Sequence, residues 1–156
     1  MSTEIYQLVD GNGMPLVVLL TAGQAGDSPM FGPLMALPRI GRNLGRPRTR
    51  PDAVRADKAY SSRAIRGHLR SRGVVAIIPE PADQQGDRKG RGSRGGRPPA
   101  FDADASKGRN VVERRFCHLK QWRGIATRYD KLAITYRVAV VLNAVVTWSR
   151  LSSDRP

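Results

Sequence analysis

The sequence predicts an α/β fold, and three observations support this prediction. Residues 1–21 have the pattern of a β-hairpin. Residues 53–78 have the order strand, helix, strand, which is typical of a parallel crossover unit. Residues 106–122 and 129–151 have the apolar periodicity of helices. We therefore expect both antiparallel and parallel strands, flanked by helices.

The first 21 residues contain two short extended segments joined by a tight turn. Residues 4–8 alternate loosely in polarity, and residues 15–21 form an apolar, β-branched run. Between them lies Asp10-Gly-Asn-Gly13, whose glycine and asparagine residues accept the backbone angles of hairpin turns. Asp10 is interpreted as a turn residue because aspartate side chains commonly cap their own turn.

Residues 26–51 are predicted to form one short helix and then a basic loop. Residues 26–37 are expected to form a loop, capped by Asp27 or Ser28, that leads into the short helix, although Pro33 weakens the pattern. The loop is either a disordered linker or a segment that contacts phosphates, because glycine and proline prevent packing without preventing contact. Its arginines are Arg39, Arg42, Arg46, Arg48 and Arg50.

The crossover unit at 53–78 contains the first candidate site residue. The strand over 53–57 ends on Asp57, and Ser61 or Ser62 is expected to cap the following helix. Sites in open α/β sheets tend to form at the carboxyl ends of strands, where Asp57 lies. The alternative is that Asp57 only caps the helix that follows.

Residues 79–105 are predicted to be a flexible basic loop, low in hydrophobic residues. The run 90–95 formally matches a dinucleotide-binding fingerprint, but prolines follow it where a helix would have to begin, so we reject the match. The loop either orders on nucleic acid or is a solvated linker. Its cations are Arg88, Lys89, Arg91, Arg94 and Arg97.

The helix predicted over 106–122 carries charged residues in a regular pattern. Arg109, Glu113 and Lys120 would lie within about 40° of one another on this helix. One face would then hold a carboxylate between two cations, which suits a metal-binding acid beside a polyanion. The alternative is an ordinary amphipathic helix with a solvated charged face. Three residues form the neighbouring apolar stripe: Val112, Phe116 and Leu119.

The last segment is predicted to be a core helix. After a break at Gly124, an apolar helix is expected over 129–151. Its run from Val138 to Trp148 is rich in β-branched residues but exceeds the usual length of a strand.

Charge and composition indicate the class of partner and the compartment. The net charge is +14, from 27 Lys and Arg against 13 Asp and Glu. Such an excess attracts polyanions, so nucleic acid is the expected partner and an anionic membrane surface the weaker alternative. A single cysteine excludes an intrachain disulfide, and no secretion signal or apolar run of ~20 residues is present. We therefore expect a cytoplasmic, nucleoid-associated protein without membrane contact.

Three motifs resemble those of bacterial insertion-sequence transposases of the DDE type. They are Ala56-Asp-Lys-Ala-Tyr-Ser-Ser62, Arg109-Asn-Val-Val-Glu-Arg114 and Lys120-Gln-Trp-Arg-Gly-Ile-Ala-Thr-Arg-Tyr-Asp130. Arg109, Glu113 and Lys120 also match the signature Arg-x3-Glu-x6-Lys of that family. The resemblance extends from the first hairpin to the last helix and implies an RNase H-like fold, with a mixed sheet flanked by helices.

The resemblance also implies roles for individual residues. Asp57 corresponds to the second acid of the catalytic triad and Glu113 to the third, and both would bind Mg2+ or Mn2+. The resemblance further implies that several cationic side chains hold DNA phosphates. The residues expected to contact DNA are Arg109, Lys120, Arg114, Lys58, Arg91 and Arg94.

Two departures from the family pattern bear on activity. Ser106 stands where the signature usually has a tyrosine, so the aromatic contact is lost. The first catalytic aspartate of the family lies on a strand upstream of the hairpin, and the usual DNA-binding region lies further upstream. We therefore expect the C-terminal portion of a truncated transposase that lacks the first catalytic strand and is inactive alone.

Two functional hypotheses follow, with a third disfavoured. The first is a transposase fragment that acts on transposon ends and target DNA through metal-dependent strand cleavage and transfer. The second is a non-enzymatic basic remnant that binds DNA and interferes with an intact transposase. A second copy of the chain or an intact transposase is then a further expected partner. An RNA-binding or ribosome-associated protein is disfavoured by the motif spacing.

Overall fold

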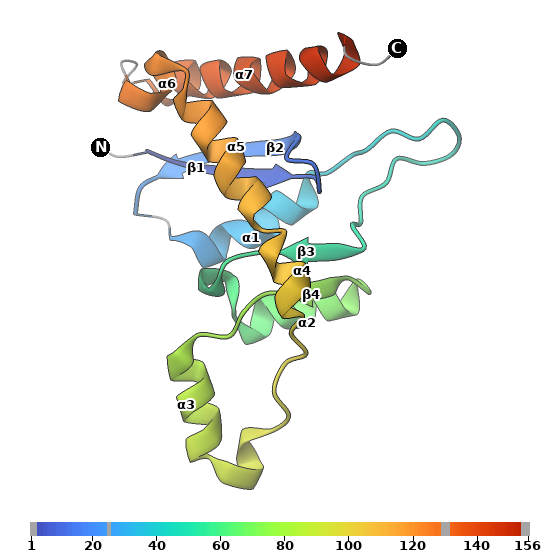
Figure 1. The fold of residues 1–156 in the computed structure, drawn as a ribbon, viewed down its shortest axis with the longest axis vertical. Helices are drawn as coiled ribbons and strands as arrows, with labels where there is room; N and C mark the ends of the chain where they lie inside the picture. Colours follow the sequence, from blue (N-terminus) through green and yellow to red (C-terminus); the bar gives the residue numbers. More distant parts are fainter. Residues whose placement is uncertain (1–2, 25, 129–131, 154–156) are drawn as a thin grey trace. The chain divides into compact units, whose positions relative to one another are not determined.

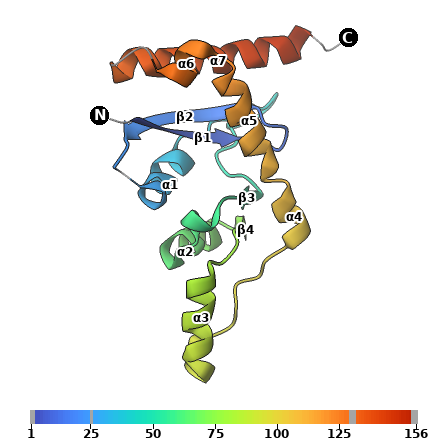
Figure 2. The ribbon, with the colours of Figure 1, turned by 60° about the vertical axis from the view of Figure 1, so that its left-hand side comes forward.

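The computed structural model describes residues 3–24, 26–128 and 132–153 (Figures 1 and 2). The chain divides into two compact units. Unit 1 comprises residues 1–26, 33–38 and 110–156, and unit 2 comprises residues 27–32 and 39–109. In the described part of the chain, no helix is both long and apolar enough to cross a membrane.

Unit 1 begins with the predicted hairpin. Strands β1 (Thr3–Val9) and β2 (Pro15–Ala22) pair antiparallel, with an irregularity between Leu8 and Val9. Asp10 organises the turn, because its Oδ1 accepts hydrogen bonds from the backbone N–H groups of Asn12 (2.9 Å) and Met14 (2.8 Å). The interpretation of Asp10 as a turn residue is therefore confirmed.

Helices α5 (Asn110–Lys120), α6 (Arg123–Thr127) and α7 (Ala133–Ser153) complete unit 1. Figure 2 shows α6 and α7 together on one side of the hairpin. Alternate residues of the strands point to this side, so the hairpin and the helices share one apolar core. Its buried cluster consists of Leu119, Ile125, Tyr136 and Val140, against which Ile5, Val18 and Leu20 pack.

The structure divides the helix predicted over 106–122. Helix α4 (Ala103–Lys107) ends before Gly108, and α5 begins at Asn110. Helix α4 begins earlier than predicted because the Asp102 side chain accepts a hydrogen bond from the Ala105 N–H (2.8 Å). Gly108 lies close to the side chain of Arg55, since an added Cβ would be 3.2 Å from Arg55 Nε.

The predicted break at Gly124 is wrong, and the final helix begins later than predicted. Gly124 lies inside α6, and α7 starts at Ala133. Glycine lowers helix propensity without forbidding a helix, and the burial of Ile125 in the core outweighs that cost. The predicted start at Tyr129 lies outside the described residues.

Unit 2 contains the predicted strand, helix, strand sequence. Strands β3 (Ala53–Arg55) and β4 (Val75–Ile77) pair in parallel. Between them lie a short 3-10 helix η1 (Lys58–Tyr60) and helix α2 (Arg63–Ser71). Ser62 caps α2, because its side chain accepts a hydrogen bond from the Ile65 N–H (3.1 Å). The buried apolar residues of these elements are Val54, Ile65, Leu69 and Ile77.

Helix α1 (Asp27–Ala36) lies where a helix was predicted, but its cap is different. Gly26 precedes the helix, and no side chain caps it, so neither Asp27 nor Ser28 has the predicted role. The arginine-rich segment that follows makes defined contacts. Ile40 and Arg48 bridge through their backbones, and Arg50 Nη1 donates to the Arg72 carbonyl oxygen (3.0 Å).

The segment 79–105 was predicted to be a loop, and this is wrong for most of its length. It contains helix α3 (Ala82–Gly90), the 3-10 helix η2 (Gly92–Gly95) and the start of α4. Pro81, which precedes the first helical residue, and Asp83, in the first turn, both favour a helix start there. The high content of glycine and arginine hid these helices from the sequence pattern.

The mixed α/β class is confirmed, with an arrangement of strands that differs from the expectation. The described strands form two separate two-stranded sheets, β1–β2 and β3–β4. A single mixed sheet would need a strand hydrogen-bonded to both pairs, and the described residues include none.

Candidate active site

Asp57 lies directly after strand β3, where the sequence pattern placed it. It is the residue before η1, with an extended backbone, and its side chain makes no capping hydrogen bond. Helix α2 is capped by Ser62 instead. The Asp57 carboxylate therefore does not serve as the helix cap that was considered as an alternative role.

The carboxylate of Asp57 instead pairs with Arg109. Arg109 Nη1 donates to Asp57 Oδ2 at 2.9 Å, although the two residues are 52 positions apart. Both belong to unit 2, so the contact lies within one compact body. The structure thus brings together one residue from each of two separate sequence motifs.

Solvent reaches both partners of this ion pair. The side chain of Asp57 is 50% exposed and that of Arg109 is 35% exposed. Exposed pairs of this kind contribute about 0–1 kcal/mol to stability, because water screens the attraction. The pair therefore contributes little to the stability of unit 2.

The predicted common face of Arg109, Glu113 and Lys120 is only partly present. Arg109 lies in the turn before α5, so it is outside the regular helix. Glu113 and Lys120 are both in α5, seven residues apart, and so lie within about 20° around the helix axis. Both are exposed, and Glu113 occupies the first turn, where the helix dipole favours a carboxylate.

The other predicted contact residues are on the surface of their own units. Arg114 is exposed on α5 in unit 1. Lys58 is exposed in η1, next to Asp57, and Arg91 and Arg94 are exposed near η2, all in unit 2. The structure brings Asp57 and Arg109 together in unit 2, whereas Glu113, Lys120 and Arg114 belong to unit 1.

The sequence pattern missed one buried charge, that of Arg115. Its side chain is 4% exposed, and its Nη1 donates to Thr147 Oγ1 (3.0 Å) while its Nη2 donates to Asn143 Oδ1. Burial lowers the pKa of Arg115 from its ordinary value. The signal that could have revealed it is the pair Asn143 and Thr147, two polar residues four positions apart in an apolar helix.

The cysteine and the two histidines of the chain are not arranged for catalysis. Cys117 and His118 are adjacent and exposed on α5, so their side chains diverge. His68 is exposed on α2, and its ring meets the ring of Phe31 edge-on, with centroids 6.2 Å apart. This ring contact indicates a packing role for His68.

The described residues do not form a complete site for a divalent cation. Among them, no group of three Asp, Glu, His or Cys side chains lies close enough together to hold a metal ion. Asp57, the candidate ligand in unit 2, is engaged by a guanidinium. Divalent cations in sites for phosphodiester chemistry require several hard oxygen ligands, so Asp57 and Glu113 do not suffice.

Comparisons with known proteins identify the family. The family model described as Transposase DDE domain matches residues 7–148. A protein of Burkholderia cepacia, described as a transposase for insertion sequence element IS402, is 30% identical over 146 residues. That match covers 92% of this chain and 62% of the relative, so this chain spans less than two thirds of its length.

A second relative comes from Brucella ovis and is described as a transposase for insertion sequence element IS6501. It is 29% identical over 155 residues, which cover 96% of this chain and the whole of the relative. No solved structure matches this chain. Because the family model covers the hairpin, the Asp57 turn, α5 and most of α7, the chain belongs to the Transposase DDE domain family.

Proposed function

We propose that this chain supplies part of the catalytic domain of an insertion-sequence transposase, with an RNase H-like arrangement in the complete enzyme. The observation that carries the proposal is the contact between Asp57 and Arg109 at 2.9 Å. An acid at the end of a strand and a cation from the signature motif meet there. A carboxylate beside an exchangeable guanidinium is suited to a substrate that carries both phosphate and metal.

In this proposal, the residues of the chain divide into two roles. Asp57 and Glu113 supply carboxylate oxygens for Mg2+ or Mn2+, and Arg109 and Lys120 bind DNA phosphates. Lys58 and Arg114 are exposed cations that extend the phosphate contacts. Such metal ions clamp the attacking and leaving oxygens of a phosphodiester when the site is complete.

The exposure of the Asp57–Arg109 pair supports a role for Arg109 in binding the substrate. Arg109 shields Asp57 in the absence of DNA, and an arriving phosphate competes for the same guanidinium. Because an exposed pair contributes only about 0–1 kcal/mol to stability, breaking the pair costs little free energy. The guanidinium fork matches phosphate oxygens, so Arg109 orients the DNA backbone beside the carboxylate.

We further propose that the isolated chain does not cut DNA. The described residues hold two candidate acids and no group of three. The third ligand would come from another segment of a transposase. Because transposon ends and target DNA are chromosomal in this proposal, the protein works in the cytoplasm with the nucleoid.

The test uses DNA that carries both ends of the encoding element, in Mg2+ or Mn2+. We expect the purified chain to bind this DNA without cutting it. Co-expression with the part of the Burkholderia cepacia relative that this chain does not cover should restore cutting, and Asp57→Asn or Glu113→Gln should reduce it about a hundredfold or more. Thermal melting of both variants checks that they fold.

Three results would contradict this proposal. Cutting by the chain alone that is lost in Glu113→Gln would show that the site is complete without another segment. Restored cutting that persists in Asp57→Asn would remove Asp57 from the site. An Arg109→Ala variant that cuts normally would remove the proposed phosphate contact.

A second candidate function is DNA binding without catalysis, in which the chain interferes with an intact transposase. The net charge of +14 and the incomplete set of acids favour it. Its affinity should fall steeply with salt, because bound phosphates release counterions. Co-expression with an intact relative should then lower the frequency of transposition, and an unchanged frequency would argue against interference.

A further inference from the structure

The segment 82–97, which we call the basic arm, contains α3, η2 and Arg97. Figures 1 and 2 show α3 leading away from β4 and α2, with which it shares unit 2. Neither α3 nor η2 contains a buried residue. The arm therefore contributes no apolar core, and its position has to be held by polar contacts. Its cations are Arg88, Lys89, Arg91, Arg94 and Arg97.

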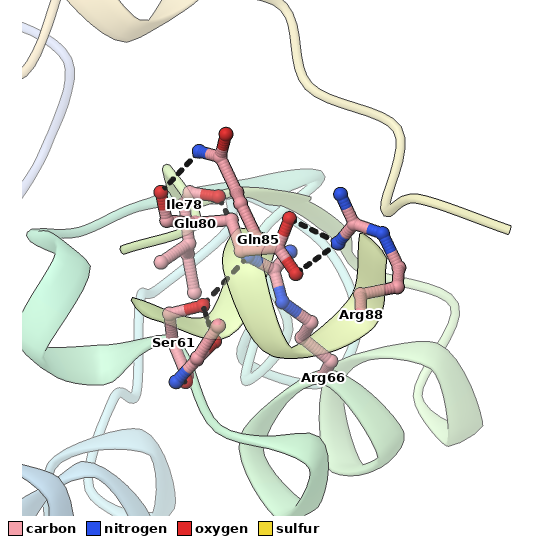
Figure 3. A network of polar contacts seen from close by, with 7 residues as sticks. Ser61, Arg66, Ile78, Glu80, Gln85 and Arg88 are labelled. Atoms are coloured by element: carbon pink, nitrogen blue, oxygen red, sulfur yellow. Dashed lines mark hydrogen bonds and ion pairs between the residues drawn. The ribbon is translucent and has the colours of Figure 1, made fainter. Parts of the chain in front are cut away.

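The first set of polar contacts holds the arm to Glu80, three residues after the end of β4. Arg88 Nη1 donates to both carboxylate oxygens of Glu80, as Figure 3 shows. The two side chains are only 18% and 16% exposed, so this pair is better shielded than the pair at Asp57. Gln85 Nε2 also donates to the Glu80 carbonyl oxygen at 2.8 Å.

The second set holds the arm to the turn that carries Asp57. Gln84 Nε2 donates to the Ser61 carbonyl oxygen (2.8 Å), and the Ser61 hydroxyl donates to Gln84 Oε1 (3.2 Å). Arg66 Nη2 donates to Ser61 Oγ (3.0 Å) and to the Ile78 carbonyl oxygen (2.8 Å) (Figure 3). Ser61 lies four residues after Asp57. The root of the arm is therefore fixed relative to the chain around this acid.

The tip of the arm folds back on α3, and this requires a glycine. A Cβ added to Gly95 would lie 2.0 Å from the Arg88 carbonyl oxygen and 2.9 Å from its carbonyl carbon. Gly92 and Gly96 have φ angles of +54° and +72°, which favour glycine. These glycines thus specify a folded tip, where composition alone had suggested a flexible loop.

The cations of the arm that have no ion pair within the described part of the chain lie at the end of α3 and in the tip. Arg88 is neutralised by Glu80, whereas Lys89, Arg91 and Arg94 make no ion pair with another described residue. Exposed arginines on a protrusion that is poor in apolar residues match the phosphates of a polyanion. The absence of buried residues argues against an apolar protein partner.

We propose that the basic arm is a preformed contact for duplex DNA, held at a set position relative to Asp57. This inference rests on the proposed function, because it takes DNA as the substrate. The arm binds backbone phosphates away from the carboxylate, while Arg109 binds them beside it. Its folded tip reduces the ordering that DNA binding would otherwise require.

The experiment measures the affinity of the full chain for a fluorescent 30-base-pair duplex at several salt concentrations. We expect the double variant Arg91→Ala, Arg94→Ala to reduce the slope of log K against log salt by about 2, since two phosphate contacts are lost. Gly95→Ala changes no charge, and we expect it to weaken binding about fivefold by displacing the tip.

Gly86→Ala is the matched control. It is the same substitution on the same arm, and an added Cβ at Gly86 meets nothing within 4 Å. We expect its affinity to equal that of the unaltered chain. Melting curves of all the variants report whether the rest of the chain stays folded.

The outcomes separate this inference from the proposed function. If the unaltered chain fails to bind DNA at low salt, both are overturned. If it binds and the arginine double variant keeps the same slope, only the arm contact is overturned. Equal affinity of Gly95→Ala and Gly86→Ala would show that the arm is not preformed. Tighter binding of an RNA duplex of equal length would overturn the assignment to DNA.

Discussion

At the scale of single residues, two arginines differ in burial and in role. Arg109 is partly exposed, and its ion pair with Asp57 is weak because solvent reaches both side chains. Arg115 is 4% exposed, has no ion pair with a carboxylate of the described residues, and donates to the polar atoms of Asn143 and Thr147. The first belongs to the candidate site, and the second orients α5 against α7.

The buried guanidinium gives a prediction about stability. Asn143→Ala removes the acceptor of Arg115 Nη2 and leaves a buried charged donor unpaired, so we expect a loss of about 1–3 kcal/mol in the free energy of unfolding. Arg115→Met removes the charge as well and should cost less. Urea denaturation of both variants measures the difference. A larger loss for Arg115→Met would show that the guanidinium is net stabilising.

At the scale of elements, α7 has two apolar faces with different surroundings. Val140 is fully buried in the core of unit 1, whereas Val138, two residues earlier, is 61% exposed. Further large apolar residues are exposed on the same helix. They are Ile134, Val141, Leu142 and Val145. The apolar run predicted a helix buried on most sides, and this is wrong, because the described part of unit 1 covers only one face of α7.

The two valines provide a matched pair of substitutions. Val140→Ala deletes buried methyl groups and leaves a cavity, so we expect a loss of about 1–3 kcal/mol in the free energy of unfolding. Val138→Ala makes the same chemical change on the exposed face and should stay within about 0.5 kcal/mol of the unaltered chain. Thermal or urea unfolding reports both. Equal losses would mean that the exposed face is covered in solution.

At the scale of the whole molecule, the charge of +14 affects stability as well as binding. Like charges repel each other in a compact state, and salt screens that repulsion. We therefore expect the melting temperature to rise between 50 and 500 mM salt, at concentrations where calorimetry is reversible. A melting temperature that falls with salt would show that attractive ion pairs dominate. Such pairs include Arg88–Glu80 and Arg48–Asp52.

Several local features were predictable because their causes are local. The turn at Asp10 depends on backbone groups two and four residues away, and the cap at Ser62 depends on the N–H group three residues later. The parallel pairing of β3 and β4 followed from the order strand, helix, strand, since a helical connection is long enough to bring the second strand back in the same direction. The division at Gly108 and the helix α3 were not predictable, because Gly108 lies against Arg55 and Gln84 of α3 bonds to Ser61, which are contacts between segments far apart in the sequence.

The sequence by itself determined the family, the order of the main strands and helices, and the identity of the candidate site residues Asp57 and Glu113. These depend on motif spacing and on interactions within a few residues. Only the tertiary structure decided that Arg109 meets Asp57, that Arg115 is buried and that Gly95 folds the arm onto Arg88. The physical reason is that each of these contacts depends on how segments pack together in space. The periodicity of one segment does not specify that packing.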